Sequence, residues 1–296
     1  MKKILFRGIA TALYTPITKG QIDYEELEAL IATQIRSGIS ALVLLGTTGE
    51  GSTVTPEERK KIIPFAVRRT GKKIPLLVGT GSNSTSVAVS MTEEAKSLGA
   101  DGALVVTPYY NRCTQEGLYE HYRAIARVGL PLLLYNVPSR TTVNIEGETA
   151  VRLARIGNVV GLKEASSDLT DVEKKLRLLD GKLSVYSGND ELNLWFFARG
   201  AAGAISVASN IKPKEITDIY MNFKNNSISV ANRENEKLAP LYKALFREVN
   251  PIPLKAAITL LRGRGGETRL PLTPAKAETK AYFQSILHTT NNGDKA

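Results

Sequence analysis

The sequence alternates short apolar runs, rich in β-branched residues, with longer segments of helical periodicity. This alternation is typical of repeated strand-helix units that build a parallel sheet. The runs begin at Gly8, Ala41, Pro75, Gly102, Pro131, Val159, Leu183 and Gly203. Eight such units within about 250 residues have the number and length of a (β/α)8 TIM barrel. A doubly wound fold is disfavoured because no G-x-G-x-x-G fingerprint opens a helix after a strand. We therefore expect an α/β protein with a TIM barrel.

The intervening segments carry helix signals. Residues 23–37 place Leu27, Leu30 and Ile31 on one face. Thr55, Pro56 and Glu58 form the pattern of an N-cap, a first-turn proline and a capping box. Beyond Ser209 we expect only helices, and these exceed the single helix that closes a barrel. They are expected at 214–225, 230–249, 252–262 and 274–287. We therefore predict a barrel at 1–225 and a small C-terminal helical appendage at 226–296.

Composition narrows the class of protein. The single cysteine, Cys113, excludes an intramolecular disulfide framework, and with two histidines, His121 and His288, a Cys/His metal site is not expected. The chain shows neither a signal-peptide core nor an apolar run long enough for a membrane span, so we expect a cytoplasmic protein without a membrane partner. The formal charge is +10, but the basic residues are scattered and the densest cluster, 262–269, has no aromatic residues for base stacking. We expect no nucleic-acid partner and assign the positive charge to attracting anionic substrates.

Lys163 directly follows an apolar run, at the strand end where barrel enzymes carry their active sites. Strand alternation places Gly161 and Lys163 on one face, with Val160 and Leu162 on the other, packed against helices. Burial disfavours the ammonium form, so a free amine at Lys163 could attack a ketone and form a Schiff base. The alternative is a lysine that snorkels or pairs with Glu164.

Two other strand ends also carry polar groups. The same alternation points Tyr135 into the barrel mouth, where a phenol can move protons. Thr47 and Thr48, within GTTGE, supply hydroxyls and exposed backbone amides for a carboxylate. Arg140, in the loop after Tyr135, can bind a second carboxylate in a bidentate fork. Each group has a structural alternative. Tyr135 could be a core tyrosine, the two threonines could belong to an ordinary strand-to-helix turn, and Arg140 could be a surface charge.

Six ordered motifs together resemble the 4-hydroxy-tetrahydrodipicolinate synthase (dihydrodipicolinate synthase) family of Schiff-base pyruvate-dependent lyases and aldolases. They are GTTGE, TPYYNR, YNVPSRT, GLKEAS, the GND at Gly188 and NPIPLK from Asn250. The resemblance covers nearly the whole chain. It implies condensation of pyruvate with L-aspartate 4-semialdehyde in lysine and diaminopimelate biosynthesis. An N-acetylneuraminate lyase or a 2-keto-3-deoxy sugar acid aldolase, using the same Lys163 and Tyr135, is the alternative, although such enzymes tend to lack the arginine of PSRT.

The resemblance also implies the roles of individual residues. Lys163 forms the imine with pyruvate, and Tyr135 relays protons with Thr48 and with Tyr110 from a neighbouring subunit. Thr47 and Thr48 receive the pyruvate carboxylate, carbonyls near Gly188 and Ile205 line the site, and Arg140 holds the aldehyde's carboxylate. The covalent pyruvate imine implies no separate cofactor and no metal. A homodimer or homotetramer is implied, and the sequence does not decide between them.

Two positions depart from the family pattern. Cys113 stands where relatives often have proline, and it touches no implied role. Val87, four residues after Asn83, stands where lysine-inhibited relatives carry an acidic residue. A hydrophobic residue cannot pair with a ligand ammonium, so we expect weak or absent inhibition by lysine. The sequence does not indicate whether the last residues, TTNNGDKA, are ordered.

Overall fold

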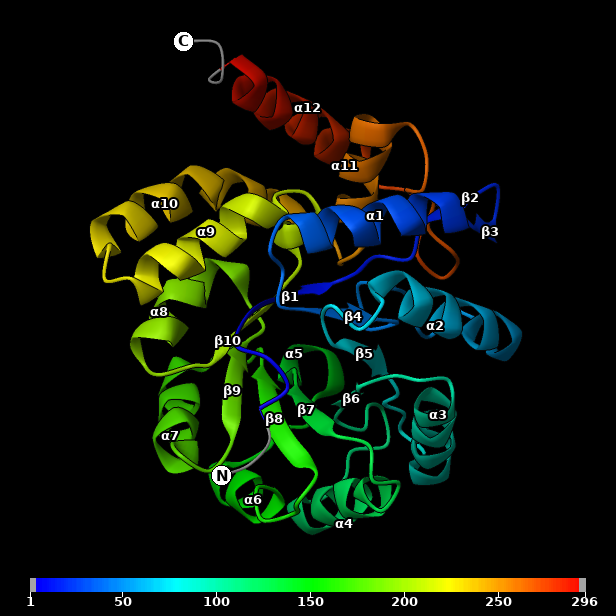
Figure 1. Ribbon diagram of the computed structural model, residues 1–296, viewed down its shortest axis with the longest axis vertical. Coiled ribbons are helices and arrows are strands. Elements are labelled where there is room, and N and C mark those ends of the chain that lie inside the picture. Colours follow the sequence, from blue (N-terminus) through cyan, green and yellow to red (C-terminus); the bar gives the residue numbers. More distant parts are fainter. Residues whose placement is uncertain (1–3, 293–296) are drawn as a thin grey trace.

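The eight apolar runs form a closed barrel of parallel strands, which confirms the predicted fold (Figure 1). The computed structural model describes residues 4–292, with side chains described as far as Leu287. β1 closes the barrel by pairing with β10 on one side and β4 on the other. The barrel strands are β1 (Gly8–Ala12), β4 (Ala41–Leu44), β5 (Leu76–Gly79), β6 (Gly102–Val106), β7 (Leu132–Asn136), β8 (Val159–Glu164), β9 (Ser184–Ser187) and β10 (Gly203–Ser206).

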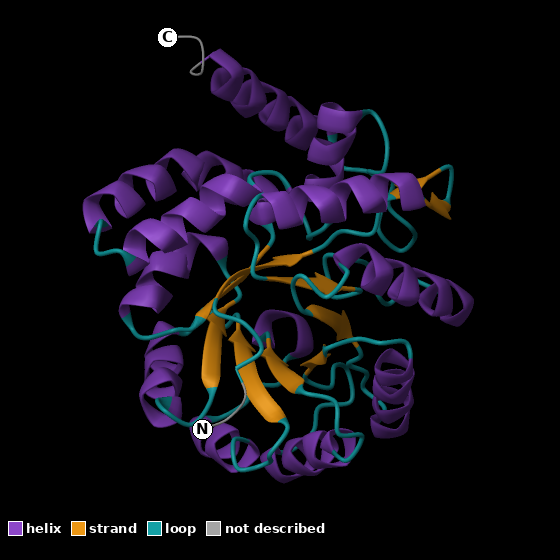
Figure 2. Cartoon of the chain, in the orientation of Figure 1, coloured by secondary structure: helices purple, strands orange, loops and turns teal. Residues whose placement is uncertain are grey.

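Helices surround the barrel and cover the outer faces of its strands (Figure 2). Thr55 and Glu58 form the predicted capping box at the start of α2. The helices up to the last barrel strand are α1 (Tyr24–Arg36), α2 (Pro56–Thr70), α3 (Thr85–Ser97), α4 (Gln115–Ala126), α5 (Pro138–Thr141), α6 (Gly147–Leu153), α7 (Leu169–Leu179) and α8 (Asn193–Ala198), with the 3-10 turn η1 (Asp190–Leu192). Within residues 4–292, every helix is too short or too polar to cross a bilayer.

The chain after β10 is helical, as predicted. It contains the 3-10 turn η2 (Ala208–Asn210), α9 (Pro213–Lys224), α10 (Ile228–Leu245), α11 (Ile252–Arg262) and α12 (Ala277–Asn292). α12 projects beyond the barrel, while α10 packs on α9 (Figure 1). Leu241 and Leu254 share one buried cluster with outward-facing strand residues. We therefore propose that the division at 225/226 separates the barrel from the C-terminal helices, although the two parts share one hydrophobic core.

Three local features differ from the sequence-based expectations. A short antiparallel hairpin, β2 (Ile17–Thr18) and β3 (Gln21–Ile22), follows β1 and was not expected. α10 ends at Leu245, not at Val249, so residues 246–251 form a connection to α11. Of the tail whose order was left open, residues 293–296 lie outside the described residues.

The expected orientation of Val160 is wrong. The β7–β8 register shifts between Leu132 and Leu133, so that Val159 pairs with Leu132 and Gly161 with Leu133. The shift leaves Val160 as an extra residue, as in a β-bulge, and interrupts the strict alternation of side chains. Val160 consequently packs in the inner barrel cluster, whereas Leu162 packs in the outer cluster as expected.

Candidate active site

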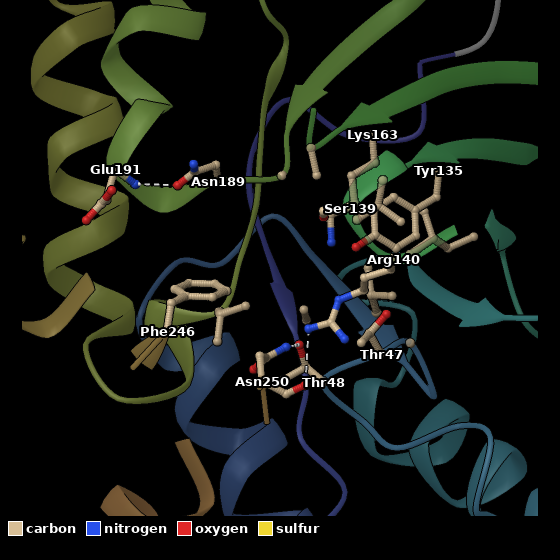
Figure 3. A pocket seen from close by; sticks show the side chains of 18 residues that line it. Thr47, Thr48, Tyr135, Ser139, Arg140, Lys163, Asn189, Glu191, Phe246 and Asn250 are labelled. Atoms are coloured by element: carbon tan, nitrogen blue, oxygen red, sulfur yellow. Dashed lines mark hydrogen bonds between the residues drawn. The ribbon is translucent and has the colours of Figure 1, made fainter. Parts of the chain in front are cut away.

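A cavity of about 300 Å³ lies at the carboxyl ends of the barrel strands and contains Lys163 (Figure 3). In a TIM barrel this end collects the loops that carry catalytic side chains. The cavity brings together predicted residues from four separate segments of the chain. Those that line it are Thr47, Thr48, Tyr135, Arg140, Lys163 and Gly188.

Lys163 is near the end of β8, and its register partner on β7 is Tyr135. Both side chains therefore point to the same side of the sheet. Lys163 is 6% exposed, and its Nζ lies 4.3 Å from the centroid of the Tyr135 ring. Among the ion pairs of residues 4–292, none includes Lys163, so no described carboxylate competes for its amine.

Glu164 does not pair with Lys163, because it points to the opposite face of β8. There its carboxylate lies 2.6 Å from Lys175 Nζ, with both side chains 1% exposed. Asn136, at the end of β7, donates hydrogen bonds to both carboxylate oxygens of Glu164. These contacts join the strand ends that carry Tyr135 and Lys163 to α7 behind them.

Gly188 follows β9 and closely approaches Lys163. A Cβ atom at this position would lie 3.1 Å from Lys163 Cε and 2.8 Å from Ala165 Cβ. Such distances are shorter than ordinary van der Waals contact, so glycine leaves the space through which the lysine side chain runs.

Thr47 and Thr48 lie in the loop after β4. Glu50 of the same loop has a positive φ of 50° and forms a buried ion pair with Lys255 of α11. Burial lowers the pKa of Lys255, while its interaction with Glu50 opposes the shift. Arg269 donates its backbone N–H to Glu50 at 3.1 Å. The C-terminal helical region thus holds the loop that presents the two threonines.

Arg140 lies in the short helix α5, which begins at Pro138 directly after β7. Its guanidinium lines the cavity, and its Nη2 donates a 3.3 Å hydrogen bond to the backbone carbonyl of Asn250 (Figure 3). The contact leaves other N–H groups of the fork for a bound carboxylate. Arg140 and Lys163 are the basic side chains that line the cavity and Glu191 is the acidic one, so basic groups outnumber acidic groups at a site suited to anionic substrates.

Two predicted residues do not line this cavity in a single chain. Tyr110 is 91% exposed and has a φ of 73°, on the loop after β6. The side chain of Ile205 packs in the inner barrel cluster, and Val207, two residues later, lines the cavity instead.

Several lining residues were not assigned a role from the sequence. They include Ser139, Asn189, Glu191, Val207, Phe246 and Asn250. Phe246 and Asn250 come from the connection between α10 and α11, far along the chain from the strands. The NPIPLK motif marked Asn250 as part of the family pattern, but no property of the motif indicated its contacts.

A larger cavity of about 730 Å³ adjoins the first and shares Thr47, Tyr135, Arg140 and Asn250 with it. Its other residues include Arg59, Val87, Glu94 and Tyr109. Within residues 4–292, no group of three or more His, Cys, Asp or Glu side chains is arranged to hold a metal ion.

Comparison with known proteins finds relatives over nearly the whole chain. Residues 5–290 match the model of the dihydrodipicolinate synthetase family. A 4-hydroxy-tetrahydrodipicolinate synthase of Kosmotoga olearia is 47% identical over 288 residues, covering 96% of this chain and 98% of the relative. The crystal structure of dihydrodipicolinate synthase from Thermotoga maritima superposes with a TM-score of 0.95 at 42% identity, covering 97% of this chain and 99% of that one. A structure described as a monomeric dihydrodipicolinate synthase variant has the same TM-score at 41% identity, covering 97% of each chain.

Proposed function

The chain belongs to the dihydrodipicolinate synthetase family, and we propose that its cavity condenses pyruvate with L-aspartate 4-semialdehyde to give 4-hydroxy-tetrahydrodipicolinate. The enzyme is thus a lyase of lysine and diaminopimelate biosynthesis. One observation carries the assignment: the buried amine of Lys163, outside any described ion pair, lies against Tyr135 in a cavity that Arg140 also lines. Arg140 favours this reaction over sugar-acid aldolase chemistry, because it offers a site for the carboxylate of the second substrate.

The first half-reaction takes place at Lys163. Its amine attacks the ketone carbon of pyruvate, the carbonyl oxygen takes up a proton from the relay described below and leaves as water, and a protonated imine remains. The imine withdraws electrons from the neighbouring methyl carbon, which loses a proton to give an enamine. Tyr135 relays these protons together with Thr48 and with Tyr110 of a second subunit. Thr47 and Thr48 bind the pyruvate carboxylate, and carbonyls near Gly188 and Ile205 complete the site.

The second half-reaction uses Arg140, whose guanidinium binds the carboxylate of the aldehyde. The enamine carbon then attacks the aldehyde carbon and forms the new C–C bond. The substrate's own amine attacks the imine carbon and displaces Lys163, which closes the ring and frees the enzyme. The covalent imine supplies the electron sink, so the reaction requires no separate cofactor. We further propose that the enzyme works in the cytoplasm as a homodimer or homotetramer.

Trapping of the imine tests this function. Incubation with pyruvate and borohydride should attach a pyruvate-derived group to the peptide that contains Lys163, as read by mass spectrometry. The Lys163→Met variant should show neither the adduct nor condensation, whereas Lys182→Met, at an exposed position, should retain both. An unmodified Lys163 in the wild-type protein would contradict the mechanism. An adduct without turnover of L-aspartate 4-semialdehyde would contradict the substrate.

A further inference from the structure

Asn250 contacts residues of both proposed substrate subsites. It lies in the connection between α10 and α11, is 5% exposed, and lines the cavity. Its side-chain Nδ2 donates a 3.0 Å hydrogen bond to Thr48 Oγ1, and its backbone carbonyl accepts the bond from Arg140 (Figure 3). Side chain and backbone of one residue thus reach the threonine loop and the arginine separately.

The side-chain bond determines what the Thr48 hydroxyl can do. A hydroxyl has one proton to donate and two lone pairs, whereas an amide N–H2 can only donate. Because Asn250 occupies a lone pair of Thr48 Oγ1, the Thr48 proton must point elsewhere. Thr48 Oγ1 makes no other hydrogen bond to residues 4–292, so its proton is available to a ligand in the cavity.

The opposite orientation of the amide is less favourable. In the observed orientation one atom, Oδ1, is buried without a partner among the described residues. A reversed amide would place Nδ2 there and leave its N–H groups without an acceptor. Buried N–H groups without an acceptor are rarer in folded proteins than carbonyl oxygens without a donor, so the orientation in which Nδ2 donates to Thr48 and Oδ1 is unpaired is preferred.

We propose that Asn250 is a positioning residue that turns the Thr48 hydroxyl into a donor for the pyruvate carboxylate. The inference rests on the proposed function, since it requires a carboxylate at Thr48. The side chain of residue 250 is thereby assigned to the pyruvate subsite. The hydrogen bond from Arg140 goes to the backbone carbonyl of residue 250, so it is retained when the side chain is replaced. Substitution of the side chain should therefore affect one substrate and spare the other.

The Asn250→Asp variant provides the sharpest test, because aspartate has nearly the same shape and only accepts. The Thr48 proton would then turn toward residue 250, and a negative charge would lie near the pyruvate carboxylate. We expect the KM for pyruvate to rise about tenfold or more, as for loss of a hydrogen bond to a charged group. The KM for the aldehyde should change by less than about twofold. Asn225→Asp, at an exposed position after α9, is the matched control and should leave both values unchanged.

The Thr48→Val background separates positioning from general damage. If Asn250 acts through the Thr48 hydroxyl, adding Asn250→Ala, which introduces no charge, to Thr48→Val should raise the KM for pyruvate by no more than about twofold, a non-additive pair. An unchanged KM for pyruvate in Asn250→Asp would overturn the proposal, because Thr48 would then already donate to residue 250. An equal rise in both KM values, or full additivity of Asn250→Ala with Thr48→Val, would overturn it as well.

Two further measurements keep the test decisive. If Asn250→Asp does not fold, Asn250→Ala replaces it. The same selective rise in the KM for pyruvate is expected, and an equal rise in the KM for both substrates would contradict the proposal. The pyruvate concentration that half-saturates borohydride trapping on Lys163 reports pyruvate binding without the aldehyde. A wild-type protein that traps pyruvate but does not use the aldehyde would contradict the proposed function, while the trapping curves of the variants would still decide the role of Asn250.

Discussion

Val87 lines the larger cavity and is 46% exposed, at the position where lysine-inhibited relatives carry an acid. Both carboxylates that line this cavity already have cationic partners: Glu94 pairs with Arg59 at 3.3 Å, and Glu50 pairs with Lys255. Neither is free to bind the ammonium group of a ligand, and Arg59 repels one. We predict that millimolar L-lysine lowers the condensation rate of the wild-type enzyme by less than about half, which corresponds to a dissociation constant for lysine above about 1 mM.

The Val87→Glu variant is the complementary experiment for lysine. An added carboxylate in the cavity that Tyr109 also lines should make the enzyme measurably more sensitive to lysine, as an inhibition curve in the steady-state assay would show. Val87→Gln, which adds similar volume without charge, is the control. Loss of all wild-type activity at submillimolar lysine would refute the prediction.

The buried Glu164–Lys175 ion pair joins β8 to α7, on the face of β8 opposite to Lys163. Removing one partner of such a pair leaves an uncompensated buried charge, which typically costs about 3–5 kcal/mol. We predict that Lys175→Met lowers the free energy of unfolding by about this amount, measured by urea denaturation.

The neighbouring Lys174→Met substitution is a matched control for Lys175. Lys174 pairs with Glu148 on the surface, where the two side chains are 51% and 69% exposed. Exposed pairs contribute about 0–1 kcal/mol, so this variant should be nearly as stable as the wild type. Equal stability of the two variants would contradict the prediction that the buried pair stabilises the fold.

Tyr110 has a proposed catalytic role, but within a single chain its side chain is exposed and does not line the Lys163 cavity. If it acts from a second subunit, two inactive variants should complement each other. Mixed dimers of Lys163→Met and Tyr110→Ala contain one site with an intact lysine on one chain and an intact tyrosine on the other. We predict that refolding the two variants together restores activity that neither shows alone.

As a control for subunit exchange, each variant is refolded separately, and the two refolded proteins are then combined in the assay. Native mass spectrometry would give the subunit number in the same samples. Failure of co-refolded mixed oligomers to regain activity would show that Tyr110 does not act across the subunit interface.

The number and order of the barrel strands could be predicted from the amino-acid sequence, because each buried strand of a parallel barrel must be apolar and bounded by polar turns. It also indicated which residues end those strands, and hence that Thr47, Tyr135 and Lys163 would converge. Alternation failed only at Val160, because a register shift depends on how two strands pair and not on the residues of one. The capping box at Thr55 was predictable for the opposite reason, since all of its hydrogen bonds are local.

The partner of each strand-end group could be read only from the folded chain. Glu164, next to Lys163 in sequence, pairs with Lys175 because adjacent strand residues face opposite sides of the sheet. Asn250 meets Thr48 across 202 positions because α10 ends at Leu245 and returns the chain to the barrel mouth. Helical periodicity continues to Val249 and conceals that end. Contacts between segments so far apart follow from the closure of the barrel and the docking of the C-terminal helices, which no local pattern encodes.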